Sequence, residues 1–199
     1  MDEPNVGQKR TADKLISRPP TRKDLVHLCK ELNQREAKYV VVGGLAIIAA
    51  GHARTTADVD LVVATDSDNE ARIFSALSTL PDNAVRELQP GELKQYTVVR
   101  VGDEILVDLM RSASGIDYDQ ASKDIIVREM DGVSIPFASP RLLWRMKANT
   151  HREKDAGDLV FLRQWFAERG EQPPQVDGSP QEQKSAKPKW LRALEKFFR

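Results

Sequence analysis

Acidic residues interrupt two apolar segments of this sequence. Asp58 and Asp60 stand on either side of Val59, and Asp108 lies within the apolar run 105–110. Side chains two positions apart on a strand project to the same face, so Asp58 and Asp60 can meet at one point. A carboxylate among apolar residues is costly unless it is paired or metal-bound, and hard cations prefer oxygen ligands. The pattern therefore indicates a site for one or two divalent ions, although exposed aspartates on an edge strand would give the same spacing.

Small, basic and hydroxyl side chains precede these aspartates. Gly43 and Gly44 follow a short β-branched segment, and glycines at such a turn let a phosphate approach the backbone N–H groups. A cation and two hydroxyls then stand just before Asp58, namely Arg54, Thr55 and Thr56. This order of residues is typical of a site for a phosphorylated ligand.

Composition and missing motifs exclude several other classes. The 30 Lys and Arg equal the 30 Asp and Glu, which argues against a broadly basic nucleic-acid coat protein. The sequence has no P-loop, dinucleotide-binding, zinc-protease or serine-hydrolase motif. Cys29 is the one cysteine, so it cannot form an internal disulfide or a multi-cysteine zinc site. It lies on the apolar stripe of an expected helix, so we expect it to be a buried apolar residue. No run approaches the roughly 18 apolar residues of a membrane span, and no apolar signal core begins the chain. We expect a soluble, cytoplasmic protein.

Hydrophobic period and turn residues predict an α+β fold with a mixed sheet flanked by helices. Helices are expected after an N-cap at Thr21, after Ser139 and Pro140, and from an S/T-x-x-E capping box at Thr150. Further helices are expected over 45–50 and 70–80, and strands over 39–42, 59–63, 96–101, 104–110, 125–130 and 133–137.

The same signals predict four parts of the chain. Residues 1–20 are expected to form a mobile arm, 21–169 the domain, 170–187 a linker, and 188–199 a short amphipathic helix. The apolar side of that helix can dock on its own domain, on a partner or on a membrane surface.

Together the motifs resemble the nucleotidyltransferase superfamily that includes DNA polymerase β. The resemblance covers about residues 36–110 and rests on Val42-Gly43-Gly44, on Asp58-Val59-Asp60-Leu61 and on Asp108 as the later strand carboxylate. A second group is similar to the later motifs of the AbiEii-type toxins of abortive-infection and toxin–antitoxin systems. It consists of Lys147, Arg152, Lys154, Asp155 and Asp158, and it departs from that branch in having Lys154 where arginine is common.

The resemblance implies transfer of a nucleoside monophosphate from an NTP to a hydroxyl acceptor. Asp58, Asp60 and Asp108 would be the catalytic residues and would hold two Mg²⁺ ions, or Mn²⁺ in their place. The nucleotide would be bound by Gly43, Gly44, Arg54, Thr55, Thr56, Lys147, Arg152 and Asp158. The acceptor, an RNA 3′ end, a protein or a small molecule, is left open, as are the base preference and a cognate antitoxin.

Two other interpretations stay open beside the enzyme. Basic residues at both ends of the chain would suit a non-catalytic nucleotide- or RNA-binding protein of the same fold. A structural or partner-binding protein is the third. Around Lys147, a solvated helix face with loose ion pairs is the alternative to a phosphate site. For the phosphate site, we expect Lys147 to reach outward from the end of its helix.

Overall fold

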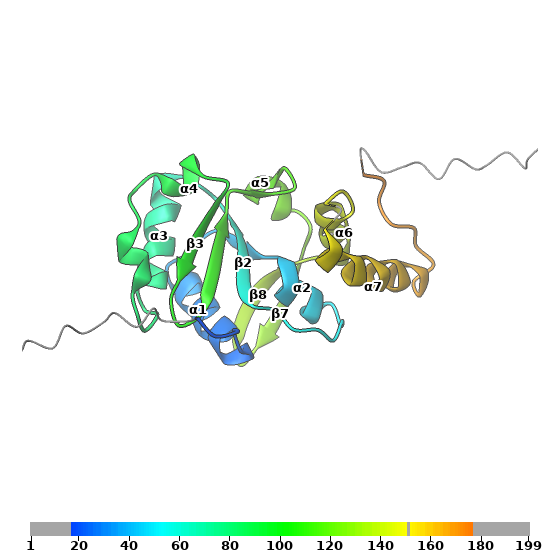
Figure 1. The fold of residues 1–199 in the computed structure, drawn as a ribbon, viewed down its shortest axis with the longest axis horizontal. Coiled ribbons are helices and arrows are strands. Elements are labelled where there is room, and N and C mark those ends of the chain that lie inside the picture. The colour runs from blue at the N-terminus through cyan, green and yellow to red at the C-terminus, as the bar shows by residue number, and fades with distance from the viewer. Residues whose placement is uncertain (1–16, 151, 177–199) are drawn as a thin grey trace, which may run out of the picture. The chain divides into compact units, whose positions relative to one another are not determined.

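The computed structural model describes residues 17–150 and 152–176 (Figure 1). The chain divides into two compact units, and the boundary lies between Leu143 and Trp144, inside helix α6. The expected domain 21–169 therefore spans both units. Among the described residues, no helix is long and apolar enough to cross a membrane.

The first unit is built on a mixed sheet. Within the described residues this sheet has six strands in the order β3-β4-β2-β1-β8-β7 (Figure 1). Its strands are β1 (Tyr39–Val41), β2 (Asp58–Val63), β3 (Val98–Gly102), β4 (Leu106–Met110), β7 (Ile125–Met130) and β8 (Val133–Ala138). The central pair β2–β4 is parallel, as is β1–β8, whereas β1–β2, β3–β4 and β7–β8 are antiparallel. A separate small hairpin joins β5 (Ser112–Ala113) to β6 (Ile116–Asp117).

Helices connect and cover these strands. In the first unit they are α1 (Arg22–Gln34), α2 (Gly43–Ala49), α3 (Ser67–Leu77), α4 (Glu92–Gln95) and α5 (Tyr118–Ala121), with a 3₁₀ turn η1 (Ala84–Glu87). Helix α6 (Pro140–Lys147) runs into the second unit, which also contains η2 (Glu153–Asp155) and α7 (Ala156–Ala167).

The predicted start of the first helix is confirmed in detail. Thr21 caps α1, and its side chain and that of Asp24 bind each other's backbone N–H in a capping box. The apolar stripe of this helix, including Cys29, is fully buried. Arg18 donates two hydrogen bonds to Asp24, and Ser17 Oγ donates to the carbonyl of Asp103. Residues 17 and 18 of the expected mobile arm are thus bound to the first unit, and residues 1–16 lie outside the described residues.

Both predicted hairpins and the Ser139–Pro140 helix start are also confirmed. Strands β3 and β4 pair antiparallel, as do β7 and β8, whose turn places Asp131 and Gly132 at positive φ. Ser139 Oγ accepts a hydrogen bond from the N–H of Leu142, so it caps α6.

The predicted capping box at Thr150 is wrong. The last helix begins at Ala156 rather than at the residues after Thr150, and the short 3₁₀ turn η2 precedes it. Thr150 Oγ1 instead contacts Asp155 Oδ2 at 2.7 Å. The capping box does not form because the Thr150 hydroxyl donates its hydrogen bond to the buried carboxylate of Asp155. Residues 188–199, where a further helix is expected, lie outside the described residues.

Candidate active site

Three aspartates meet on one face of the central strand pair. Asp60 and Asp108 are direct neighbours in the parallel register of β2 and β4, and Asp58 is two residues before Asp60. Along β2, Val59 and Leu61 are fully buried while both aspartates are half-buried, so the carboxylates share the opposite face. One oxygen from each of the three lies within 4.8 Å of the others. The predicted convergence of these carboxylates is confirmed.

These residues fit a divalent metal. Three hard oxygen donors that come this close repel one another unless a cation lies among them. Within residues 17–150 and 152–176, no other three side chains of His, Cys, Asp or Glu form such a group. The strands that carry the donors are at the centre of the sheet, which fixes their spacing.

The glycine pair borders this cluster through side chains that approach the backbone. A Cβ at Gly43 would stand 1.8 Å from Asp60 Oδ2, and Gly43 has a φ of +61°. A Cβ at Gly44 would stand 2.4 Å from Thr56 Oγ1. Real Cβ atoms essentially never make contacts below 3.0 Å, so any larger residue at these positions would force Asp60 or Thr56 to shift. Glycine here lets Asp60 and Thr56 pack onto the start of α2.

The segment before the aspartates lies beside the same cluster. Thr56 Oγ1 donates a hydrogen bond of 3.2 Å to Asp58 Oδ1, and Arg54 Nε donates to the carbonyl of Thr55. Arg54, Thr55 and Thr56 line a hollow of about 790 Å³. Its other lining residues include Leu45, Ile48 and Phe137, so the hollow pairs an apolar wall with the polar segment.

Arg100 is a member of the site that sequence reasoning missed. In the antiparallel register of β3 and β4 it is the direct neighbour of Asp108. Its Nε and Nη2 donate hydrogen bonds of 2.7 Å each to the two oxygens of Asp108, and Nη2 lies 3.8 Å from Asp58 Oδ2. The cluster of three carboxylates therefore already contains one protein cation.

Lys147, Arg152 and Asp158 lie in the second unit, where they form a separate ionic cluster. Lys147 Nζ lies 2.6 Å from Asp155 Oδ1 and 3.0 Å from Asp158 Oδ2, and all three side chains are buried. Arg152 Nε donates to Asp155 Oδ2 at 2.8 Å, and the Arg152 side chain is 54% exposed. The outward reach expected for Lys147 is not observed, because two buried carboxylates hold its ammonium group.

Asp155 lies at the centre of this second cluster and is not among the predicted site residues. Burial alone would raise the pKa of Asp155, but hydrogen bonds from Lys147 and Thr150 and the charges of Lys147 and Arg152 lower it to about 2. The sequence signal that could have found it is a spacing: Asp155 and Asp158 stand three apart at the start of a helix whose buried residues include Leu162 and Phe166.

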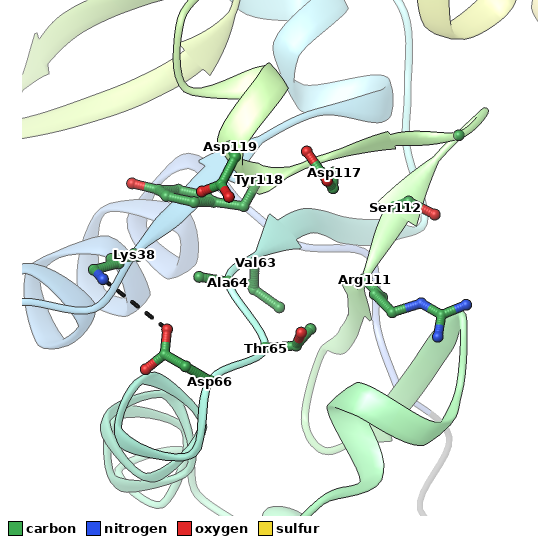
Figure 2. A pocket seen from close by; sticks show the side chains of 11 residues that line it. Lys38, Val63, Ala64, Thr65, Asp66, Arg111, Ser112, Asp117, Tyr118 and Asp119 are labelled. Carbon is green, nitrogen blue, oxygen red and sulfur yellow. Dashed lines mark ion pairs between the residues drawn. The ribbon is translucent and has the colours of Figure 1, made fainter.

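A second hollow lies at the far end of the same two central strands (Figure 2). It has a volume of about 610 Å³ and lies where β2 ends at Val63, before Ala64, and where Arg111 follows β4. Figure 2 shows cationic and anionic side chains facing it, including Lys38 and Asp66, whose charged atoms are 4.0 Å apart. None of the predicted site residues lines this hollow.

Replacing Gly43 by alanine tests the close approach of Asp60. The new Cβ would overlap the Asp60 carboxylate, and the positive φ would cost a further 1–3 kcal/mol or so. We expect a lower melting temperature and weaker divalent-metal binding. The control is Gly157→Ala in α7, where a Cβ meets nothing within 4 Å and helix propensity favours alanine. If Gly43→Ala matched the wild type in both measurements, Asp60 would not occupy this position.

The sequence matches the model of one known protein family. A family model described as "Nucleotidyl transferase of unknown function (DUF2204)" matches residues 21–176. No curated protein matches the sequence.

Several solved structures are similar to this chain, including the following two. The lincosamide antibiotic adenylyltransferase LnuA, in its lincomycin-bound form, has 14% sequence identity and a TM-score of 0.50 over 73% of this chain and 98% of that one. An antigenic nucleotidyltransferase-like protein from Paracoccidioides brasiliensis has 18% identity and a TM-score of 0.44 over 88% and 86%. At this level of identity the likeness to LnuA concerns the fold alone, and it confirms the predicted α+β class.

Proposed function

The chain belongs to a family of nucleotidyl transferases, and we propose that its three-aspartate cluster catalyses transfer of a nucleoside monophosphate from an NTP to a hydroxyl group. The single observation that carries the proposal is the meeting of Asp58, Asp60 and Asp108 within 4.8 Å beside Gly43. A pure binding protein has no need of three carboxylates brought together on the central strands.

In the proposed reaction, the acceptor oxygen forms a bond to the α-phosphorus of the NTP. The bond between that phosphorus and the bridging oxygen breaks, and pyrophosphate leaves with the electron pair. The acceptor's proton goes to a carboxylate of the cluster, and Asp108 is our candidate because it is the most buried of the three. Two Mg²⁺ ions, or Mn²⁺, held by the three aspartates would stabilise the negative charge on the phosphates.

The residues around the cluster have proposed roles in holding the triphosphate. Arg54, Thr55 and Thr56 supply a cation and hydroxyls on the segment that contacts Asp58, and they border the 790 Å³ hollow. Gly43 and Gly44 begin α2, and their backbone N–H groups are proposed to contact a phosphate beside Asp60 and Thr56. The hollow is of a size that suits a nucleoside or a small acceptor.

The second ionic cluster has a proposed role that rests on the AbiEii-type resemblance. Arg152 is the best candidate in it for a phosphate contact, because its guanidinium is half exposed. Lys147 could bind a phosphate only in exchange for a carboxylate that now holds it, and Asp158 would then be the residue that positions Lys147. The same resemblance supports a role as the toxin of a toxin–antitoxin or phage-defence system that acts in the cytoplasm, where NTPs are made.

Label transfer tests this function. The protein is incubated with Mg²⁺, total cell RNA or protein, and each NTP labelled in turn at the α-phosphate. We expect label from a preferred NTP to enter one class of acceptor, with release of pyrophosphate and loss of the reaction in EDTA. The matching γ-labelled NTP should transfer nothing, which separates this reaction from phosphorylation. NTP binding with neither label transfer nor pyrophosphate release would favour the non-catalytic alternative.

A further inference from the structure

Arg100 contacts the aspartate cluster, but the proposed reaction gives this residue no role. It lies on β3, directly across from Asp108 on β4, and its guanidinium engages both oxygens of that carboxylate at 2.7 Å. Such a bidentate pair is the strongest and most directional contact that arginine makes with a carboxylate. The same guanidinium lies 3.8 Å from Asp58 Oδ2, so it faces two of the three donors at once.

We propose that Arg100 is a built-in counter-ion of the aspartate cluster, which holds Asp108 in the metal-free protein and must release it when a divalent ion binds. This inference rests on the proposed function, since it assumes that the cluster is the metal site. It makes Arg100 a positioning residue that sets the metal affinity of the site.

Competition follows from charge and from the position of the guanidinium. Three carboxylates within 4.8 Å repel one another, and a guanidinium among them offsets part of that repulsion. Both Asp108 oxygens accept a hydrogen bond from Arg100, so a divalent ion that binds either oxygen through its other lone pair stands close to the guanidinium. A cation beside the metal also opposes its binding by like-charge repulsion.

The exchange is expected to move the arginine and leave the aspartate in place. The Arg100 side chain is 57% exposed, so it can turn into water without opening the core. The Asp108 side chain is only 9% exposed and lies on β4, between β3 and β2. The hydrogen bonds that Arg100 donates to Asp108, and the negative charge of Asp108, raise the pKa of Arg100, which therefore stays a cation throughout.

Calorimetric titration with Mn²⁺ alone, without nucleotide, tests this inference. The wild type is compared with Arg100→Met, which keeps the length of the side chain and removes its charge, and with Arg100→Lys, which keeps the charge and loses the bidentate contact. We expect Arg100→Met to bind Mn²⁺ about tenfold more tightly, the factor that corresponds to one charge-assisted hydrogen bond. Arg100→Lys should fall between the two, and it decides the question if Arg100→Met does not fold.

Melting temperature gives a second measurement, which includes the stability of the metal-free protein. Without metal, Arg100→Met should melt below the wild type, because the carboxylates lose their counter-ion. Saturating Mn²⁺ should raise its melting temperature by more than it raises that of the wild type. The control is Arg111→Met, which makes the same charge change just beyond β4, where Arg111 donates to the carbonyl of Lys94.

Each other result overturns the inference in a recognisable way. Equal Mn²⁺ affinity in the wild type and Arg100→Met would mean that Arg100 does not compete, and would leave the proposed function intact. Weaker binding by Arg100→Met would mean that the arginine orients Asp108 for the metal. Equal tightening by Arg111→Met would assign the effect to net charge. If neither the wild type nor Arg100→Met binds Mn²⁺, the metal site of the proposed function fails as well.

Discussion

Replacing Asp60 by asparagine should abolish nucleotidyl transfer while leaving the protein folded. Asp60 is the central donor of the cluster, with Asp108 beside it in the register of β2 and β4. The amide keeps the shape that packs onto Gly43 but loses the negative charge that would hold a metal. We expect transfer to fall by more than about a hundredfold, because loss of even an outer-shell partner of a metal ligand costs about 10- to 100-fold.

The stability of this variant should move in the opposite direction from its activity. Removing one of three neighbouring negative charges relieves repulsion in the metal-free protein, so its melting temperature should equal or exceed that of the wild type. The control is Asp68→Asn, the same chemical change at an exposed carboxylate in the first turn of α3. Label transfer and a thermal melt are measured on both. Full activity in Asp60→Asn would refute the catalytic assignment, and a collapsed melt would make Asp60 a structural residue.

The aspartates could be found from the sequence because their signal is local. Period two on a strand puts Asp58 and Asp60 on one face whatever the rest of the fold does. Their apolar neighbours also mark both strands as central, and hence as candidates to lie side by side. Asp108 joins these two aspartates once β2 and β4 pair in parallel, and the structure has this pairing.

Arg100 could not be found in the same way because it depends on a register. It occupies an exposed position in the alternating strand β3, where an arginine is ordinary. A two-residue turn at Gly102 and Asp103 would have placed Thr97 opposite Asp108. The observed pairing of Gly102 with Leu106 places Arg100 there instead. Asp103 is buried and accepts backbone hydrogen bonds from Asp82 and Ala84, and such distant contacts do not appear in a local pattern.

The last helix shows how a buried charge overrides a local motif. An S/T-x-x-E sequence favours a helix start, and such a cap stabilises by only about 1 kcal/mol. A buried ammonium group without partners would cost several times that amount. The segment after α6 therefore folds so that Thr150 and the turn η2 bring Asp155 to Lys147, and the helix begins after this contact.

Replacing Lys147 by methionine should destabilise the protein strongly. The substitution leaves Asp155 and Asp158 buried without the cation that now lies 2.6 and 3.0 Å from them. Loss of one partner of a buried ion pair typically costs about 3–5 kcal/mol, because the partner that remains buried loses its main compensation. We expect a loss of this order in the free energy of unfolding, measured in urea. A lysine that only reached outward to a phosphate would leave that free energy unchanged.

Lys154→Met is the matched control for this prediction. Lys154 is exposed in η2, in the same unit, and the substitution makes the same change of charge and shape. We expect its effect to stay within about 0.5 kcal/mol, as for other surface substitutions. The double variant Lys147→Met, Asp155→Asn should recover part of the lost stability, because it removes one of the two buried carboxylate charges that Lys147 contacts in the wild type.

The dependence of stability on acidic pH is an independent test of the same cluster. The folded-state pKa of Asp155 is about 2, below the value of about 3.9 for an unfolded aspartate, so the folded state favours the ionised form. Its contribution to stability is therefore complete above about pH 5 and is lost as the pH falls through about 4 to 2. Lys147 contributes most to this shift, with Thr150 and Arg152, so Lys147→Met should show a smaller loss than the wild type over that range. Parallel pH profiles for the wild type and this variant would show that Lys147 does not stabilise the ionised form of Asp155.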